Sequence, residues 1–176
     1  RGEERPLARL ASGAAEGHRA AADLGAGRYH NFFTFAWNRP LHVFDADKVT
    51  GGSLRIHPSN GGEQFLALDG KTYTLSPGQM AISDDSGGAS LAGILGGEHS
   101  GRTEATVNVF LESAWWDPIT IAATGRALKI NSDARYRFER GADPAFTLPG
   151  LDMATRMILD LCGGEASALV QDGAAL

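Results

Sequence analysis

Residues 106–128, TVNVFLESAWWDPITIAATGRAL, contain the change of pattern that decides the fold class. Up to Ser113 the residues alternate between two faces, as in a β-strand, with Val107, Val109 and Leu111 on one face and Asn108, Phe110 and Glu112 on the other. Asp117-Pro118 is then typical of a helix start, because aspartate caps the first turn and proline fits the first helical position. The stretch therefore predicts a strand over 106–113, followed by a helix over 119–128.

Strand patterns lie on the N-terminal side of this junction. Two short apolar runs, 65–68 and 71–75, flank Asp69-Gly70, and this dipeptide supplies the positive φ angles that a type I′ hairpin turn requires. Further strands are predicted over the aromatic run 32–37, which Pro40 ends, and over 53–57, 80–82 and 90–95.

Helical patterns lie on the C-terminal side. Ser132 can cap a short helix that Gly141 closes, and apolar residues recur at helical spacing from Leu151 to Cys162, where Gly163 supplies a stop. Strands followed by helices, without strict alternation, predict an α+β fold with its helices concentrated in the C-terminal third.

Length and composition exclude several classes of protein. The 176 residues, 43% hydrophobic and 21% charged, suit one domain or two small lobes, and they exclude disorder, collagen and coiled coil as descriptions of the whole chain. No apolar run reaches the roughly 20 residues of a membrane span. A net charge of −5 argues against a self-sufficient nucleic-acid binder, so we expect neither a membrane nor a DNA partner.

The N-terminal region differs from the rest of the chain. Residues 1–28 contain no aromatic residue, and we interpret them as a leader that is a peripheral helix or disordered. Residues 29–176 are then one α+β domain. The chain shows no secretory leader and no initiator methionine, which is typical of a piece of a larger protein. The single cysteine, Cys162, permits no internal disulfide, which favours a cytoplasmic setting.

The common metal and nucleotide motifs are absent from the sequence. It contains no P-loop, no Gly-x-Gly-x-x-Gly fingerprint and no His-Glu-x-x-His, and its five histidines are scattered. Asp45-Ala46-Asp47 fits either a turn after a strand or a Mg²⁺ site, and we favour the turn. We therefore predict no metal site.

Two residues, His42 and Glu112, can each be interpreted as structural or as functional. His42 is either an ordinary core histidine or a functional one, and its type alone favours the core. Glu112 shares a strand face with Phe110, where a carboxylate is costly unless it is paired, so either the face is in water or the acid has a role.

Five motifs occur in a particular order along the chain. They are Pro-Leu-His-x-Phe-Asp (40–45), Leu-Asp-Gly-Lys (68–71), Leu-Ala-Gly-Ile-x-Gly-Gly (91–97), Glu-Ser-Ala (112–114) and Ser-Asp-Ala-Arg-Tyr-Arg-Phe-Glu-Arg-Gly-x-Asp-Pro (132–144). Together they resemble the editing domain of the bacterial-type phenylalanyl-tRNA synthetase beta subunit, over about Asn31 to Gly164. The resemblance implies a β-barrel-like core sheet with flanking helices, and hydrolysis of tyrosine that is wrongly attached to phenylalanine tRNA.

The resemblance also assigns roles to residues. It places the editing-site histidine on His42 and the glutamate on Glu112. It places substrate binding on Asn31, Ala92, Gly93, Gly96, Ser132 and Ala134. The implied partners are the acceptor end of the tRNA, the synthetase alpha subunit and the rest of the beta subunit. No cofactor is implied for this domain, since ATP and Mg²⁺ serve only the synthetic site of the whole ligase.

These residue types suit the chemistry. An ionised Glu112 would accept the tyrosine O–H on an aromatic face, and a site built for the phenol leaves its polar groups unpaired with phenylalanine. His42 would orient the attacking water or take its proton. Near the tRNA, Arg126, Lys129 and Arg135 can contact phosphate, or they can make ion pairs within the protein.

Two alternatives stay open, and the first of them rests on departures from the family pattern. His30-Asn31-Phe32 stands where the family has Thr-Asn-Tyr, and Asn38 stands where it has glycine. One alternative is a non-catalytic module that braces the synthetase or binds the acceptor end. The other is an unrelated small-ligand β-barrel.

Overall fold

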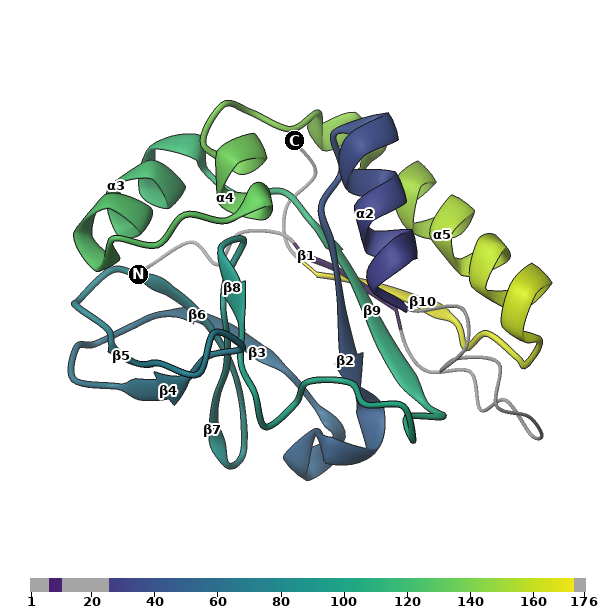
Figure 1. Ribbon diagram of the computed structural model, residues 1–176, viewed down its shortest axis with the longest axis horizontal. Helices are drawn as coiled ribbons and strands as arrows, with labels where there is room; N and C mark the ends of the chain where they lie inside the picture. Colours follow the sequence, from purple (N-terminus) through teal and green to yellow (C-terminus); the bar gives the residue numbers. More distant parts are fainter. Residues whose placement is uncertain (1–6, 11–25, 173–176) are drawn as a thin grey trace. The chain divides into compact units, whose positions relative to one another are not determined.

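The structure, a computed structural model, describes residues 7–10 and 26–172 (Figure 1). Side chains are described from Asn31 onward. The chain divides into two compact units. Unit 1 takes the described residues of Arg1–Asp47, Arg102–Trp115 and Ala142–Leu176, and unit 2 consists of Lys48–Gly101 and Trp116–Gly141.

Unit 1 contains an antiparallel sheet with the strand order β10-β1-β9-β2. Its strands are β1 (Leu7–Leu10), β2 (Leu41–Asp45), β9 (Val109–Ala114) and β10 (Leu169–Asp172). Strand β9 therefore lies between β1 and β2, β10 pairs with the other edge of β1, and the sheet is open rather than closed into a barrel.

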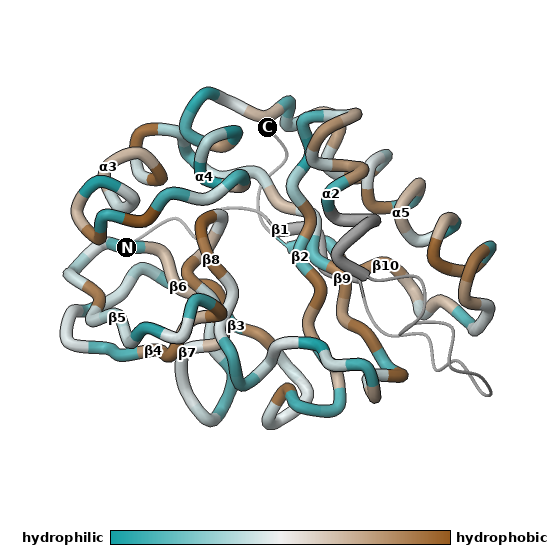
Figure 2. Tube along the Cα trace, in the orientation of Figure 1, coloured by the Kyte–Doolittle hydropathy of each residue, from teal (hydrophilic) through white to brown (hydrophobic). Residues whose placement is uncertain are grey.

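Two helices, α2 (Ala26–Trp37) and α5 (Thr147–Cys162), cover one face of this sheet. The core between them consists of Phe33, Leu41, Leu111, Leu151 and Ala154, all buried. Figure 2 shows apolar residues along the paired strands β2 and β9. Because side chains alternate along a strand, the core takes Leu41 and Leu111 and leaves their neighbours His42 and Glu112 on the opposite face.

Unit 2 contains an open sheet of order β3-β6-β7-β8 and the separate pair β4-β5. The strands are β3 (Arg55–Pro58), β4 (Gln64–Leu66), β5 (Thr72–Thr74), β6 (Met80–Asp84), β7 (Gly87–Leu91) and β8 (Leu95–Gly96). Its helices are α3 (Pro118–Leu128) and α4 (Asp133–Phe138). Of the short 3₁₀ helices, η2 (Thr50–Gly52) belongs to unit 2, η3 (Pro144–Phe146) belongs to unit 1, and η1 (Ala46–Lys48) contains residues of both.

The α+β class and most of the elements predicted from local signals are confirmed. The β4–β5 hairpin is confirmed, and Gly70 has a φ of +76°, but the turn is not type I′, because Asp69 is not among the described residues with positive φ. The Asp117 carboxylate accepts a hydrogen bond from Thr120 N, which caps α3, and Ser132 caps α4. Helix α5 ends at Cys162, and Gly163 follows as its cap with a φ of +70°. At each of these positions a residue with a special backbone or capping role marks the boundary.

Two predictions near the N-terminus are wrong. The aromatic run 32–37 belongs to helix α2 rather than to a strand, because Phe33 and Trp37, four residues apart, share a helix face that meets the core and Phe146. Leu7–Leu10, predicted within a peripheral helix or disordered leader, form strand β1 inside the sheet. The rest of that leader, residues 1–6 and 11–25, lies outside the described residues, and 26–28 already belong to α2.

Candidate functional site

The pairing of β2 with β9 brings His42 and Glu112 together. They are directly opposite in the antiparallel register, as are Phe44 and Phe110 one step along. Side chains of such pairs lie on the same face of a sheet. The His42 and Phe44 rings are 4.3 Å apart between centroids, and Phe44 meets Phe110 edge-on at 6.4 Å. The face opposite the helices thus carries one imidazole and one carboxyl group among aromatic rings.

Glu112 is buried on this face, with 9% of its surface exposed. Its Oε2 atom has no hydrogen-bond partner among the described residues. Burial raises the pKa of Glu112 to about 8, because a charge removed from water without a partner is disfavoured. The acid is therefore mostly neutral at pH 7, which corrects the expectation of an ionised carboxylate. A neutral carboxyl group can both donate and accept a hydrogen bond.

In unit 2 the sequence Ala92–Gly97, here called the glycine loop, turns from β7 into β8. Gly93 has a φ of +68°, and a Cβ atom there would lie 2.5 Å from Trp116 Cδ1. Only glycine fits this position without strain. Ala92, Ile94 and Gly97 donate backbone hydrogen bonds to Met80, Leu91 and Ala89. The backbone N–H and C=O of Gly93 bond to no other described residue.

Ser132 is tied to this loop. Its hydroxyl donates to the Ile94 carbonyl at 2.6 Å and accepts from Arg135 N at 3.1 Å. The first bond joins the start of α4 to the glycine loop, and the second caps the helix. Ala134 follows in the first turn of α4 and is half-buried.

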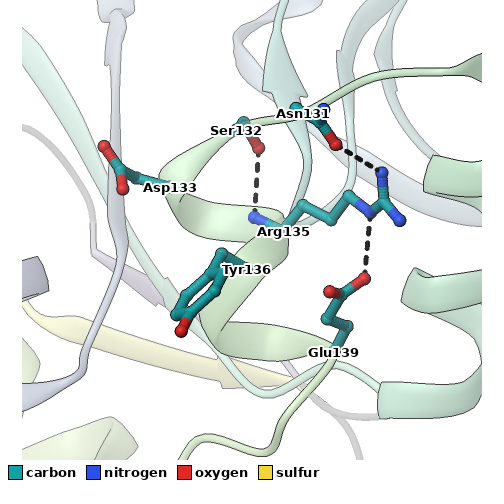
Figure 3. A pocket seen from close by; sticks show the side chains of 6 residues that line it. All are labelled: Asn131, Ser132, Asp133, Arg135, Tyr136 and Glu139. Carbon is teal, nitrogen blue, oxygen red and sulfur yellow. Dashed lines mark hydrogen bonds and ion pairs between the residues drawn. The ribbon is translucent and has the colours of Figure 1, made fainter.

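A pocket of ≈ 380 Å³ lies along α4 (Figure 3). It is lined by Asn131, Ser132, Asp133, Arg135, Tyr136 and Glu139. Figure 3 shows the Arg135 guanidinium directed at Asn131 and Glu139, with distances of 3.0 Å to each, and the group also donates to the Ile130 carbonyl. Arg135 is thus engaged within unit 2.

Comparison with known proteins gives the family. Residues 29–163 match the family model described as the B3/4 domain. The chain belongs to the B3/4 domain family.

Relatives of this B3/4 domain are beta subunits of a tRNA ligase. The phenylalanine–tRNA ligase beta subunits of Cereibacter sphaeroides and Ruegeria pomeroyi are 76% and 67% identical to it over 144 residues. Those residues are 82% of this chain and 18% of each relative, so the chain spans less than a fifth of the relatives' length. An N-terminal fragment of the phenylalanyl-tRNA synthetase beta subunit from Pyrococcus horikoshii has a TM-score of 0.49 at 16% identity, over 72% of this chain and 45% of that one.

The predicted site residues of the B3/4 domain fall into separate groups. His42 and Glu112 are adjacent in unit 1, whereas Asn31 lies on α2 with an exposed side chain. In unit 2, Ser132 contacts the segment that holds Ala92, Gly93 and Gly96.

The basic stretch of the B3/4 domain separates into two kinds of cation. Arg135 and Arg137 make i,i+4 ion pairs with Glu139 and Asp133, and Arg140 also pairs with Glu139. Arg126 and Lys129 are exposed at the end of α3 and make no ion pair within the described part of the chain. RNA contact by Arg126 and Lys129 stays a prediction, and Arg135 is the weaker candidate.

The turn interpretation of Asp45-Ala46-Asp47 fits the contacts seen. Asp45 accepts from Thr106 Oγ1 at 2.6 Å and from the Asp47 backbone, and Asn108 donates to Asp47. Among the described residues, no three His, Cys, Asp or Glu side chains are grouped to hold a metal ion. In the same part of the chain no helix is long and apolar enough to cross a membrane.

Sequence reasoning missed Trp116, which lies against Gly93 and is 6% exposed. A signal was present: Trp116 directly precedes the cap residue Asp117, and Ile121 is the fourth helical position of α3. An apolar pair at these positions commonly packs together at a helix start. Both side chains border the place where a Gly93 Cβ would lie.

Proposed function

We propose that this B3/4 domain hydrolyses tyrosine that has been attached in error to phenylalanine tRNA, as the editing domain of a phenylalanine–tRNA ligase beta subunit. The single observation that carries the proposal is the buried Glu112 carboxyl group, whose Oε2 has no described partner, directly across the strand pair from His42. Polar atoms buried without a partner are costly, and a ligand that supplies one relieves that cost.

The proposed specificity follows from the surroundings of Glu112. An apolar pocket that accepts phenylalanine rejects an added hydroxyl by only about 10²-fold, so a synthetic site needs a second sieve. A site that hydrogen-bonds the phenol can discriminate by roughly 10⁴–10⁵-fold, because phenylalanine leaves its polar atoms unpaired. Neutral Glu112 can accept the phenol O–H and also donate to the phenol oxygen. The adjacent rings of Phe44 and Phe110 suit an aromatic ligand.

The proposed chemistry is attack of water on the ester carbonyl carbon. A C–O bond forms from water, the ester bond to the ribose breaks, and the ribose oxygen leaves with a proton. His42 orients the water and accepts its proton, since an imidazole titrates near neutral pH. Tyrosine and uncharged tRNA are the products. Water is the only co-reactant, so the reaction needs no cofactor of its own.

The other assignments belong to the same proposal. Following the family resemblance, it also assigns roles in amino-acid binding to backbone groups of the glycine loop, to Asn31 and to Ala134. Exposed Arg126 and Lys129 contact phosphates of the acceptor end. The partners are phenylalanine tRNA, the alpha subunit and the rest of the beta subunit, in the cytoplasm where tRNA is charged.

The decisive experiment is deacylation of tyrosyl-tRNA(Phe) and phenylalanyl-tRNA(Phe) by the full-length protein assembled with its partner subunit. The proposal expects rapid hydrolysis of the tyrosyl ester alone. Glu112→Ala should erase this preference, Glu112→Gln should retain part of it because an amide also donates and accepts, and Glu98→Ala, at an exposed glutamate, should leave it unchanged.

His42→Ala should lower kcat for the tyrosyl ester by about 10²-fold or more without making phenylalanine a substrate. Equal hydrolysis of both esters by the wild-type protein would refute the assignment. Failure to hydrolyse either ester, together with no binding of free tyrosine at millimolar concentration, would favour the non-catalytic module instead.

A further inference from the structure

Hydrogen bonds hold the glycine loop at every residue except Gly93. Each of its other residues makes at least one backbone hydrogen bond: Ala92, Ile94 and Gly97 donate to strands β6 and β7, and the Gly96 carbonyl accepts from Leu68 at 2.9 Å. The Leu95 carbonyl accepts from the Ser90 hydroxyl at 3.2 Å. Gly93 therefore presents its N–H and C=O on a backbone whose neighbours are held in place.

Ser132 supplies the restraint on Ile94, the residue after Gly93. A serine hydroxyl has one proton, and this one is used in the 2.6 Å bond to the Ile94 carbonyl. The same oxygen accepts from Arg135 N. Ser132 is thus already committed to the loop and to the helix start, and its hydroxyl has no proton left to donate to a bound amino acid.

Trp116 supplies the restraint on Gly93 itself. A Cβ atom at Gly93 would lie 2.5 Å from Trp116 Cδ1 and 3.0 Å from Ile121 Cδ1, so the Gly93 Cα rests directly against this buried pair. The pair also starts helix α3. The starts of α3 and α4 are therefore both tied to the same loop.

We propose that Ser132 and Trp116 are positioning residues that hold the glycine loop in its binding shape, Ser132 through the Ile94 carbonyl and Trp116 through the Cα of Gly93. This rests on the proposed function of the loop in amino-acid binding. If the restraints are released, the Gly93 backbone groups lose their fixed direction, and substrate binding weakens while the hydrolytic step at His42 is unchanged.

The test separates the two bonds of Ser132. Ser132→Asp keeps a good helix cap but has no proton for the Ile94 carbonyl, and Ser132→Gly also caps well without that bond. We expect either variant, in the full-length protein, to raise KM for tyrosyl-tRNA(Phe) about tenfold with kcat nearly unchanged. Ser132→Thr keeps both bonds and should restore the wild-type KM.

A second readout does not depend on activity. In Ser132→Asp and Ser132→Gly, hydrogen exchange at the amides of Ile94 and Gly97 should accelerate about tenfold. The amide of Ser59, which donates to Gln79 at 2.7 Å elsewhere in unit 2, should not change. Trp116→Phe should likewise accelerate exchange at Ile94 and raise KM, whereas Trp115→Phe at the neighbouring residue should do neither.

The outcomes are distinguishable. If the wild-type protein does not prefer the tyrosyl ester, the proposed function fails, and the exchange rates still decide whether Ser132 and Trp116 hold the loop. If the wild-type protein edits but Ser132→Asp, Ser132→Gly and Trp116→Phe keep wild-type KM and exchange rates, the positioning roles are overturned.

Discussion

At the scale of single residues, two positions are most important for the proposed function. Glu112 is a buried acid with an unpartnered oxygen, and Gly93 is a glycine pressed against an indole ring. The buried acid lowers the stability of the fold, and the close contact at Gly93 permits no larger residue there. Positions that depart from the usual rules of folding in this way are expected to be functional.

Glu112→Gln should stabilise the protein at pH 8 and leave it nearly unchanged at pH 5. The folded-state pKa of about 8 lies above the ordinary value of 4.5, so the folded protein binds a proton that the unfolded chain releases in this window. The free energy of unfolding of the wild-type protein should therefore fall by about 1.4 kcal/mol per pH unit between pH 4.5 and pH 8, and a glutamine should remove this dependence on pH. Urea unfolding at pH 5, 6.5 and 8 measures it. Parallel slopes for the two proteins would show that Glu112 is ionised when folded.

Gly93→Ala should destabilise the protein more than Gly70→Ala. Both glycines have positive φ, so both variants meet backbone strain of about 1–2 kcal/mol. A Cβ at Gly70 meets nothing within 4 Å, whereas at Gly93 it clashes with Trp116, which adds about 1–3 kcal/mol. Urea midpoints of the two variants give the difference. Equal midpoints would mean that Trp116 yields freely.

At the scale of elements, one arginine joins three parts of unit 1. Arg39 follows α2, is 1% exposed, and donates to the carbonyl of Ala114 at the end of β9 at 2.7 Å and to the carbonyl of Asp143 before η3. Burial lowers the pKa of Arg39 to about 10, partly offset by the nearby Asp143 charge. Because the guanidinium plane reaches two carbonyls at once, it fixes the end of α2 against the sheet.

Arg39→Lys should cost about 3 kcal/mol of stability. A lysine ammonium cannot reach both carbonyls in the planar geometry of the guanidinium, so a buried acceptor is left without its donor. Arg156→Lys is the matched control, since Arg156 makes an exposed i,i+4 pair with Asp152, and it should change stability by less than about 0.5 kcal/mol. Chemical denaturation of both variants compares them. A small effect at Arg39 would contradict the role of this contact.

At the scale of the whole molecule, two acids oppose each other in their effect on pH dependence. Burial raises the pKa of Glu112 in unit 1. Asp84 in unit 2 is also buried, which alone would raise its pKa, but hydrogen bonds from His99, Ser86 and Thr50 outweigh burial and hold its pKa well below its usual range. The distances to Ser86 N, Thr50 N and His99 Nε2 are 2.8, 2.9 and 2.9 Å.

The stability contributed by these two groups should peak near pH 4, between their ordinary pKa values of 3.8 and 4.5. Asp84 stabilises the fold above its ordinary pKa of 3.8 and loses that contribution as the pH falls below about 4, whereas the Glu112 contribution declines as the pH rises from 4.5 through 8. Asp84→Asn should remove the acid limb and cost about 2 kcal/mol at pH 7, because an amide nitrogen would face backbone donors. Thermal unfolding from pH 3 to 8 measures the curve. If Asp84→Asn still loses stability below about pH 4, other carboxylates are responsible for that loss.

Local signals in the sequence determined much of this protein: the β4–β5 turn at Asp69-Gly70, the capped starts of α3 and α4, the end of α5 at Gly163 and the two faces of β9. Each of these depends on residues within a few positions of one another. The composition of the aromatic run 32–37 favours a strand, whereas in the structure the run is helical and places Phe33 in the same buried core cluster as the distant Leu151. Three features of the candidate site likewise involve residues far apart in the chain. They are the pairing of His42 with Glu112, the burial that keeps Glu112 neutral, and the contacts of Ser132 and Trp116 with the glycine loop. Tertiary structure alone decided them, since their energies exist only after distant segments have packed together.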